Sequence, residues 1–343
     1  MLKRLLSGIA AVALGVAVTG EALAQAKEIR WGVSRVGSSG HRALVNLAEL
    51  LGKEMKDYQF TVQPTPGAIV SVKGYATGEF EGYYGADIAF YELANDSNRF
   101  KGFKEGMKRQ PVQSFWTFTV ETGVGIHRRD MDKYKKWGDL AGKRVFTGPR
   151  PWDVRANTER AFDVLGIKHE YIEVDIGTAG SLLESGRIDA FGMYTNAEAT
   201  TAPWIIEAGL ATDWVVLSPS AEELDALTKA GFTTTKVKAS VLEEDVGAEE
   251  IVLLPFYYGF HVGTEVPADD VYRMLTIIEK NAKALAEADK GFTQIAADMA
   301  GMQRRGVEAA AHLVPIHAGL AKYMRERGVW DAKWDDRVAD ATN

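Results

Sequence analysis

Apolar and polar residues follow a regular order along the first hundred positions. Apolar runs at residues 29–34 and 60–63 are bounded by Gly, Pro and Ser, which predicts two strands. Between them, apolar residues recur at helical spacing: Leu44, Leu47, Leu51 and Met55. A helix over 69–75, closed by Gly78, and a third strand over 86–91 continue the order. This repetition predicts parallel strands with helical crossovers, and ligands beyond the carboxyl ends of the strands.

The same order starts again at residue 145. Strands are predicted over 145–146, 171–174 and 188–193, with 194–196 as a loop after the last of them. Helices are predicted between these strands, the first with apolar positions Val154, Ala161, Leu165 and Ile167, and the others over 177–185 and around Trp204. Two copies of one architecture predict two α/β domains.

Extended apolar segments near 121–126 and 255–262 are predicted to cross between the domains. Helices follow, the first with one apolar face made of Val271, Met274, Leu275, Ile278, Ala282 and Leu285. A last helix is predicted over 315–328. We therefore expect domain I to comprise residues 25–122 plus 256–343, with the C-terminal helices, and domain II to comprise residues 123–255.

The N-terminus is predicted to be a targeting signal. Lys3 and Arg4 precede an apolar run over 5–19, and Ala22-Leu23-Ala24 fits a cleavage site, so residues 1–24 form a secretory signal peptide. The alternative is a retained membrane anchor, although the apolar run is shorter than a bilayer span. Export to the periplasm is therefore expected.

Composition restricts the classes of function. The 343 residues are 46% hydrophobic and 25% charged, as in a soluble globular protein, and the net charge of −7 gives no footprint for nucleic acid. The absence of Cys excludes disulfides and thiolate sites. The six histidines form no metal-ligand spacing, and no nucleophile elbow, P-loop or dinucleotide motif occurs. We expect no enzymatic activity, metal or cofactor.

The stretch 145–155 carries the candidate chemistry. A strand enters a Gly/Pro loop with Arg150 and Trp152, and Arg155 follows at the start of a helix. A helix start presents unpaired N–H groups, and Arg matches a carboxylate in two-point fashion, so the stretch suits an organic anion. The alternative is a surface turn with solvated arginines.

Seven motifs in this order resemble the TAXI family, the extracytoplasmic solute receptors of TRAP transporters. The motifs cover residues 37–40, 65–67, 78–79, 86–89, 140–145, 148–149 and 186–191. The resemblance implies an α/β fold of the periplasmic-binding-protein type, with two domains, each a mostly parallel sheet flanked by helices, and a hinge between them. It also implies a monomer that delivers a small organic acid, such as a dicarboxylate, an oxo acid or an amino acid, to a membrane permease driven by an ion gradient.

Family members contact the ligand through loops that correspond here to Ser38, Ser39 and His41; Thr65 and Gly67; Tyr91 and Glu92; and residues 148–155. Three positions depart from the family pattern. His41 replaces an aromatic residue, residues 65–68 read Thr-Pro-Gly-Ala, and residues 148–153 read Gly-Pro-Arg-Pro-Trp-Asp where small residues are more usual. The identity of the ligand therefore does not carry over.

These observations combine into one hypothesis for the site. Arg155, or Arg150 as second choice, pairs with the carboxylate, while Ser38, Ser39, Thr65 and Asn196 form hydrogen bonds. Trp152 and Tyr194 close the apolar side. Two other functions stay open: a sensory module for a membrane signalling partner, and a secreted hydrolase or lyase on the same scaffold.

Overall fold

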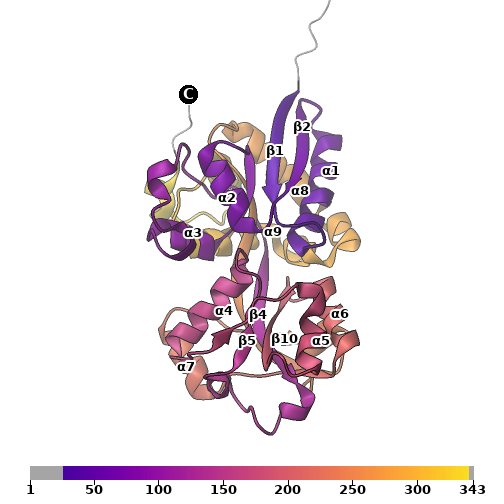
Figure 1. Cartoon of the computed structure of the whole chain (residues 1–343). Coiled ribbons are helices and arrows are strands. Elements are labelled where there is room, and N and C mark those ends of the chain that lie inside the picture. Colours follow the sequence, from indigo (N-terminus) through magenta and orange to yellow (C-terminus); the bar gives the residue numbers. More distant parts are fainter. Residues whose placement is uncertain (1–25, 340–343) are drawn as a thin grey trace, which may run out of the picture.

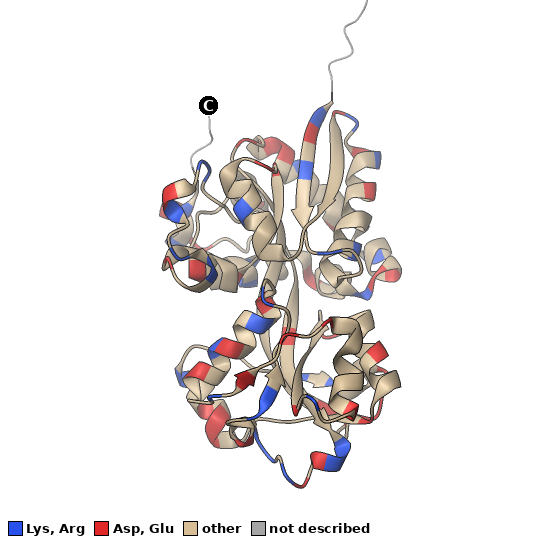
Figure 2. Ribbon diagram, viewed as in Figure 1, with Lys and Arg blue, Asp and Glu red and all other residues tan. Residues whose placement is uncertain are grey.

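The computed structural model describes residues 26–339, which fold into two α/β lobes (Figure 1). The predicted signal peptide lies outside the described residues. The N-terminal and C-terminal elements form the first lobe, at the top of Figure 1, and the middle of the chain forms the second. In Figure 2 basic and acidic residues are interspersed along the helices of both lobes. Their numbers in the sequence are similar, so neither sign dominates these surfaces.

Three strands and three helices open the first lobe: β1 (Lys27–Val33), α1 (Ser39–Glu54), β2 (Tyr58–Pro64), α2 (Ala68–Thr77), β3 (Gly82–Ala86) and α3 (Asp87–Ala94). β1 lies between β2 and β3 and is parallel to both. The helix predicted over 69–75 is therefore confirmed as α2, which ends at Gly78 in a left-handed conformation with φ of 89°.

The strand predicted over 86–91 is wrong. The strand β3 ends at Ala86, and the following residues form α3, whose first turn has Asp87 accepting the N–H of Ile88 at 2.7 Å. The run Ile88–Phe90 is buried on α3, and a short apolar run by itself does not distinguish a buried strand from a buried helix. Tyr91 therefore lies on a helix and not at the end of a strand.

The second lobe contains six short strands and four helices: β5 (Arg144–Phe146), α4 (Asp153–Val164), β6 (Glu170–Tyr171), α5 (Ala179–Glu184), β7 (Ala190–Asn196), β8 (Thr200–Thr201), α6 (Pro203–Ala211), β9 (Trp214–Val216), α7 (Ala221–Lys229) and β10 (Thr235–Lys238). The long strand β11 (Glu250–Val262) also begins in this lobe. The loop predicted at 194–196 is wrong, because β7 continues through Asn196 by pairing with β4 (Trp116–His127). β6 is also shorter than predicted.

The strands β4 and β11 run through both lobes and join them. β11 is antiparallel to β3 over 258–262 and to β4 over 254–259, and β4 is antiparallel to β7 over 120–126. One curled sheet results, with the strand order β2-β1-β3-β11-β4-β7-β5-β6. The predicted α/β class, with helices flanking the sheet, is confirmed. In the first lobe β1 pairs in parallel with β2 and β3, as predicted. The second lobe is mixed: β5 is parallel to β6 and β7, whereas β7 is antiparallel to β4 and β8, and β9 is antiparallel to β4.

The C-terminal helices complete the first lobe: α8 (Ala268–Ala288), α9 (Thr293–Ala310) and α10 (Ala318–Glu326). All six residues of the predicted apolar face of α8 are buried. α10 begins at Ala318 and not at residue 315, because the ring of His317 accepts the N–H of Gly319 and caps the helix.

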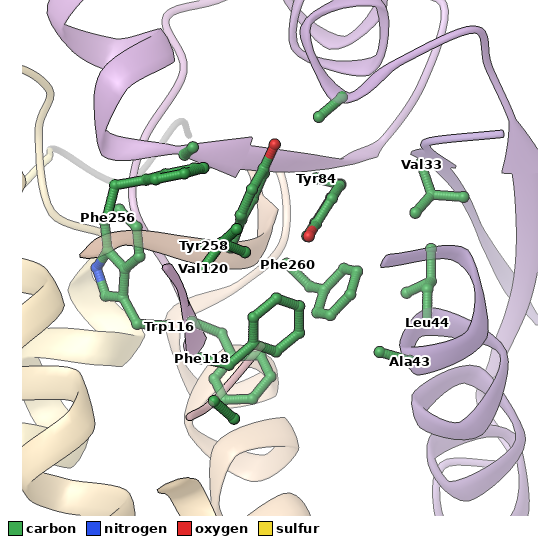
Figure 3. Packing of buried hydrophobic residues seen from close by; sticks show 14 of the residues in the cluster. Val33, Ala43, Leu44, Tyr84, Trp116, Phe118, Val120, Phe256, Tyr258 and Phe260 are labelled. Atoms are coloured by element: carbon green, nitrogen blue, oxygen red, sulfur yellow. The ribbon is translucent and has the colours of Figure 1, made fainter. Parts of the chain in front are cut away.

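Aromatic side chains fill the core where the joining strands enter the first lobe (Figure 3). Tyr84 of β3 stacks on Tyr258 of β11, with ring centroids 4.2 Å apart and an interplanar angle of 9°, and Phe260 packs on Tyr84 at 4.8 Å. The end of β3 and the middle of β11, where Tyr258 lies opposite Ala86, thus meet at the boundary between the lobes, where the site lies.

Candidate functional site

A small cavity lies between the two lobes. The first lobe contributes Ser34, Ser38, Ser39, Gly40, Ala68 and Tyr84 to its walls. The second lobe contributes Trp152, Asp153, Val154, Tyr194 and Asn196, and the joining strands contribute Val120 and Tyr258. The cavity has a volume of about 30 Å³, roughly two to three times the minimum that holds one water.

Loops after β1 and β2 form the wall of the first lobe. Ser38 caps α1, since its Oγ accepts the N–H of His41 at 3.2 Å, and this fixes Ser39 and Gly40 at the helix start. The hydroxyl of Thr65 lies 2.6 Å from the carbonyl oxygen of Val33 and 2.8 Å from that of Gly67, so Thr65 ties the second loop to the first.

The loop that opens the second lobe packs directly against the first lobe. The indole N–H of Trp152 donates to the carbonyl of Pro66 at 3.4 Å. A Cβ placed on Gly67 would lie 2.9 Å from the carbonyl oxygen of Pro151, so the absence of a side chain at Gly67 permits this approach. The lobes are therefore in contact on this side of the cavity.

A direct hydrogen bond also joins the lobes inside the cavity. Ser39 Oγ donates to Asn196 Oδ1 at 2.9 Å, and both side chains are buried. Tyr194 lies two residues earlier on β7, where its hydroxyl accepts from Trp204 at 3.3 Å and its ring meets that of Trp152 edge-on at 6.4 Å. The end of β7 thus supplies one polar and one aromatic wall.

Asp153, the first residue of α4, is a fully buried carboxylate held by the first lobe. Arg99 donates to Asp153 Oδ1 at 2.7 Å, and the Tyr258 hydroxyl donates to Oδ2. Arg99 also donates to Glu92 at 2.7 Å. Burial raises the pKa of Glu92, and burial next to Asp153 raises the pKa of Tyr258 well above its usual range, so that Tyr258 keeps its proton.

The structure brings some of the predicted site residues together. Ser38, Ser39, Trp152, Tyr194 and Asn196 line the cavity. Thr65 and Gly67 support its walls without lining it, and His41 lies in the first turn of α1, with its N–H on Ser38.

The two predicted arginines lie outside this cavity. Arg150 is exposed and forms a 3.0 Å ion pair with Glu173. Arg155 lies over the ring of Tyr171, 4.1 Å from its centroid, and 3.5 Å from Glu159. It lines a separate surface hollow between α3 and α4, together with Tyr91 and Glu92. At the start of α4, the charged side chain that lines the cavity is that of Asp153 and not that of Arg150 or Arg155.

Among the polar lining residues, sequence reasoning missed Ser34, Tyr84 and Tyr258, and it included Asp153 only as part of the loop 148–155, without a role. Asp153 directly follows Trp152 in the stretch singled out for chemistry. An acidic side chain at the start of a helix interacts favourably with the helix dipole, and this could have marked Asp153 as a residue of the site. Tyr84 was missed because the third strand was placed too late in the sequence. Tyr258 lies within a long apolar strand, where nothing in the pattern distinguishes it from its neighbours.

Within residues 26–339, acidic and histidine side chains and the longer helices bear on two further kinds of site. No group of three or more His, Asp or Glu side chains in this range is arranged to hold a metal ion. None of the helices described is long and apolar enough to cross a membrane.

Fold and cavity together define a two-lobed α/β protein with a cavity between lobes that are joined by two strands. The family model for the NMT1-like family matches residues 40–328, and the chain belongs to that family. Among the curated proteins no match was found.

Several solved structures are similar at low identity. The alkanesulfonate-binding protein SsuA from Xanthomonas axonopodis pv. citri, bound to MOPS, is 15% identical over 89% of this chain and 92% of its own, with a TM-score of 0.47. A ligand-binding component of an ABC-type import system from Staphylococcus aureus is 13% identical over 91% and 96%, with a TM-score of 0.44. A TRAP periplasmic solute-binding protein from Anaerococcus prevotii, with bound glucuronate, is 15% identical over 90% and 96%, with a TM-score of 0.41.

Proposed function

We propose that the protein is an extracytoplasmic solute-binding protein of a membrane transporter. It captures a small solute between its lobes and delivers it to a permease. One observation carries the proposal: one cavity is lined by polar and aromatic residues of both lobes, and Ser39 and Asn196 join the lobes inside it. Binding there couples solute capture to the relative position of the lobes.

The joining strands β4 and β11 supply the hinge. Within residues 26–339 the backbone passes between the lobes at these two strands, near 120 and 256. We propose that domain I comprises residues 25–122 plus 256–343 and domain II residues 123–255. Because the cavity holds little more than water with the lobes in contact, a solute enters when they move apart at this hinge.

The TAXI-like motifs support a TRAP-type permease as the partner and a carboxylate-bearing solute as the cargo. We propose export by the signal peptide at residues 1–24 and a periplasmic location for the mature chain. Its action is capture and release, with no chemical change to the solute.

Small-angle scattering on the mature chain, combined with a thermal-shift screen of organic acids, amino acids and sulfonates, tests this function. A solute present at 100 times its Kd adds about 2.7 kcal/mol to the free energy of unfolding. A solute that raises Tm should also reduce the radius of gyration. If no solute in the screen does both, the proposed function is wrong.

A further inference from the structure

A basic segment follows α3 in the first lobe, and none of its residues lines the cavity. Residues 99–109 contain five Lys or Arg side chains and one acidic side chain, Glu105, although the whole chain has a net charge of −7. Lys101, Lys104 and Lys108 are exposed, and none of the three forms an ion pair with a residue in the described range. Positive charge is therefore concentrated at one place on the surface of an acidic protein.

A surface hollow with a volume of about 560 Å³ lies beside this segment. Its walls are the end of α3, the segment itself and the turn after α9 that holds His312 and Leu313. Lys104, Lys108 and Arg109 are among the lining residues, and no Asp or Glu is among them, all of these residues lying within the described range. The hollow therefore has the size of a small-ligand site and a positively charged lining.

Hydrogen bonds hold the basic segment beside the hollow. The backbone N–H groups of Lys108 and Arg109 both donate to the carbonyl of Ala76, at 2.8 and 3.0 Å, and the ammonium group of Lys104 donates to the carbonyl of Ala94 at 2.8 Å. Ala94 is itself a lining residue, so the Lys104 ammonium group lies at the wall of the hollow. The positive charges are thus in place before a ligand arrives, which lowers the cost of binding it.

Arg109 differs from the two lysines because a carboxylate already holds it. Its guanidinium donates to Glu265 at 2.9 Å and to the carbonyl of Phe80 at 3.0 Å. Arg109 therefore adds little free charge to the hollow, and the unpaired ammonium groups of Lys104 and Lys108 supply the attraction for an anion. An ammonium group is a compact charge with three donors that rotate, which suits an anion whose oxygens point in several directions.

We propose that this hollow binds a phosphate group, carried either by a soluble phosphate ester or by an anionic phospholipid. The ammonium groups of Lys104 and Lys108 pair with the phosphate oxygens, and the side chains of Gln110 and His312, which also line the hollow, donate hydrogen bonds to them. All the lining residues belong to the first lobe, so the site stays complete when the lobes move. It is separate from the cavity, with which it shares no residue.

Calorimetry and vesicle co-sedimentation on the mature chain distinguish the two sources of phosphate. Glycerol 3-phosphate is the soluble probe, and glycerol is its uncharged control. Vesicles that contain phosphatidylglycerol are compared with vesicles of phosphatidylcholine, whose phosphate is neutralised by choline. Binding of glycerol 3-phosphate assigns the hollow to soluble esters, and retention by the phosphatidylglycerol vesicles alone assigns it to phospholipid. Either interaction should weaken as the salt concentration rises, because salt screens exposed charges.

Two double variants locate the site. The combination of Lys104→Ala and Lys108→Ala should weaken binding about tenfold or more, since a lysine next to an anionic surface contributes about fivefold. The combination of Lys168→Ala and Lys238→Ala removes two exposed lysines of the second lobe and changes the net charge equally, so it is the control and should leave binding unchanged. Both variants should keep the Tm of the wild type, because all four side chains are exposed.

Absence of binding by both phosphate probes would overturn this proposal and leave the proposed function standing, because the hollow and the cavity share no residue. Equal weakening in the two double variants would also overturn it, since net charge alone would then explain the interaction. Succinate provides the last comparison. If it binds as tightly as glycerol 3-phosphate, and loses as much affinity in the variant without Lys104 and Lys108, the assignment to phosphate is wrong.

Discussion

Ser39 at the start of α1 donates a 2.9 Å hydrogen bond to Asn196 at the end of β7, across 157 positions of sequence and between the two lobes. Both residues line the cavity, and both are buried. The contact forms because β7 extends as far as Asn196, which pairs with Val120 of β4. One contact therefore both joins the two lobes and forms part of the cavity wall.

Loss of this hydrogen bond should favour the open arrangement. Ser39→Ala and Asn196→Ala should each weaken binding of the solute with the largest thermal shift by roughly 2-fold to 10-fold, as one net hydrogen bond would. The double variant should lose little more than the worse single one, because the two side chains share the bond. Calorimetry on all four proteins checks the cycle, and additive losses would show that the bond does not contribute.

Gly67 controls how closely the lobes approach. A side chain there would meet Pro151, with Cβ 2.9 Å from its carbonyl oxygen, so Gly67→Leu should hold the lobes apart without disturbing either core. Scattering should show a larger radius of gyration in the presence of solute than for the wild type. Gly52→Leu is the matched control, because a Cβ at Gly52 has no neighbour within 4 Å. An unchanged radius in the Gly67 variant would exclude this contact as the limit of closure.

Arg99→Met should destabilise the protein strongly. It leaves the Asp153 side chain, which is 0% exposed, without its cationic partner. Removing one member of a buried pair costs on the order of 3 kcal/mol, whereas Arg128→Met, which breaks an exposed pair with Asp213, should cost less than about 1 kcal/mol. Chemical denaturation of the two variants measures the difference. Equal losses would contradict the structural role given to Arg99.

The contribution of Glu121 to stability should fall as the pH rises through 7. Glu121 in β4 is buried, which raises its pKa from 4.5 to about 7 even though its carboxylate accepts from Thr119, Thr195 and the N–H of Glu198. The native state keeps this proton where the unfolded chain has lost it, so the contribution is fully present below pH 4.5 and is lost as the pH rises through 7. One such group gives a slope of up to about 1.4 kcal/mol per pH unit.

The free energy of unfolding of the Glu121→Gln variant should depend less steeply on pH than that of the wild type. The half-buried Asp87, whose pKa desolvation also raises to about 7, contributes a slope of the same sign. The buried His261 and His317, whose pKa values burial lowers to about 3 and about 4, contribute the opposite sign below pH 6.5. Urea unfolding at pH 5, 6, 7 and 8 compares the variant with wild type and with the exposed control Glu249→Gln. An identical slope in wild type and Glu121→Gln would refute the assignment.

Export should remove residues 1–24. Expression of the full chain in a Gram-negative host and N-terminal sequencing of the periplasmic fraction should give a mature chain that starts at Gln25. A chain retained in the membrane with its first residues intact would instead support an anchor.

The sequence by itself determined much of the architecture. Strand, loop and helix order predicted two α/β lobes, and the apolar spacing from Val271 to Leu285 predicted the buried face of α8. It failed at residues 86–91 because a short apolar run suits a buried helix as well as a buried strand, and this moved Tyr91 to the wrong element.

The sequence also identified loops that reach the cavity, through Ser38, Ser39, Trp152, Tyr194 and Asn196. Tertiary structure alone decided which side chain at the start of α4 faces inward. Asp153 is buried there because Arg99 and Tyr258, 54 and 105 positions away, satisfy its carboxylate, while Arg150 and Arg155 lie beside Glu173 and Tyr171. The local pattern of apolar residues determines the periodicity of each helix and strand. Burial of the Asp153 carboxylate requires a cationic partner, and that partner, Arg99, lies in the other lobe, so no local pattern encodes it.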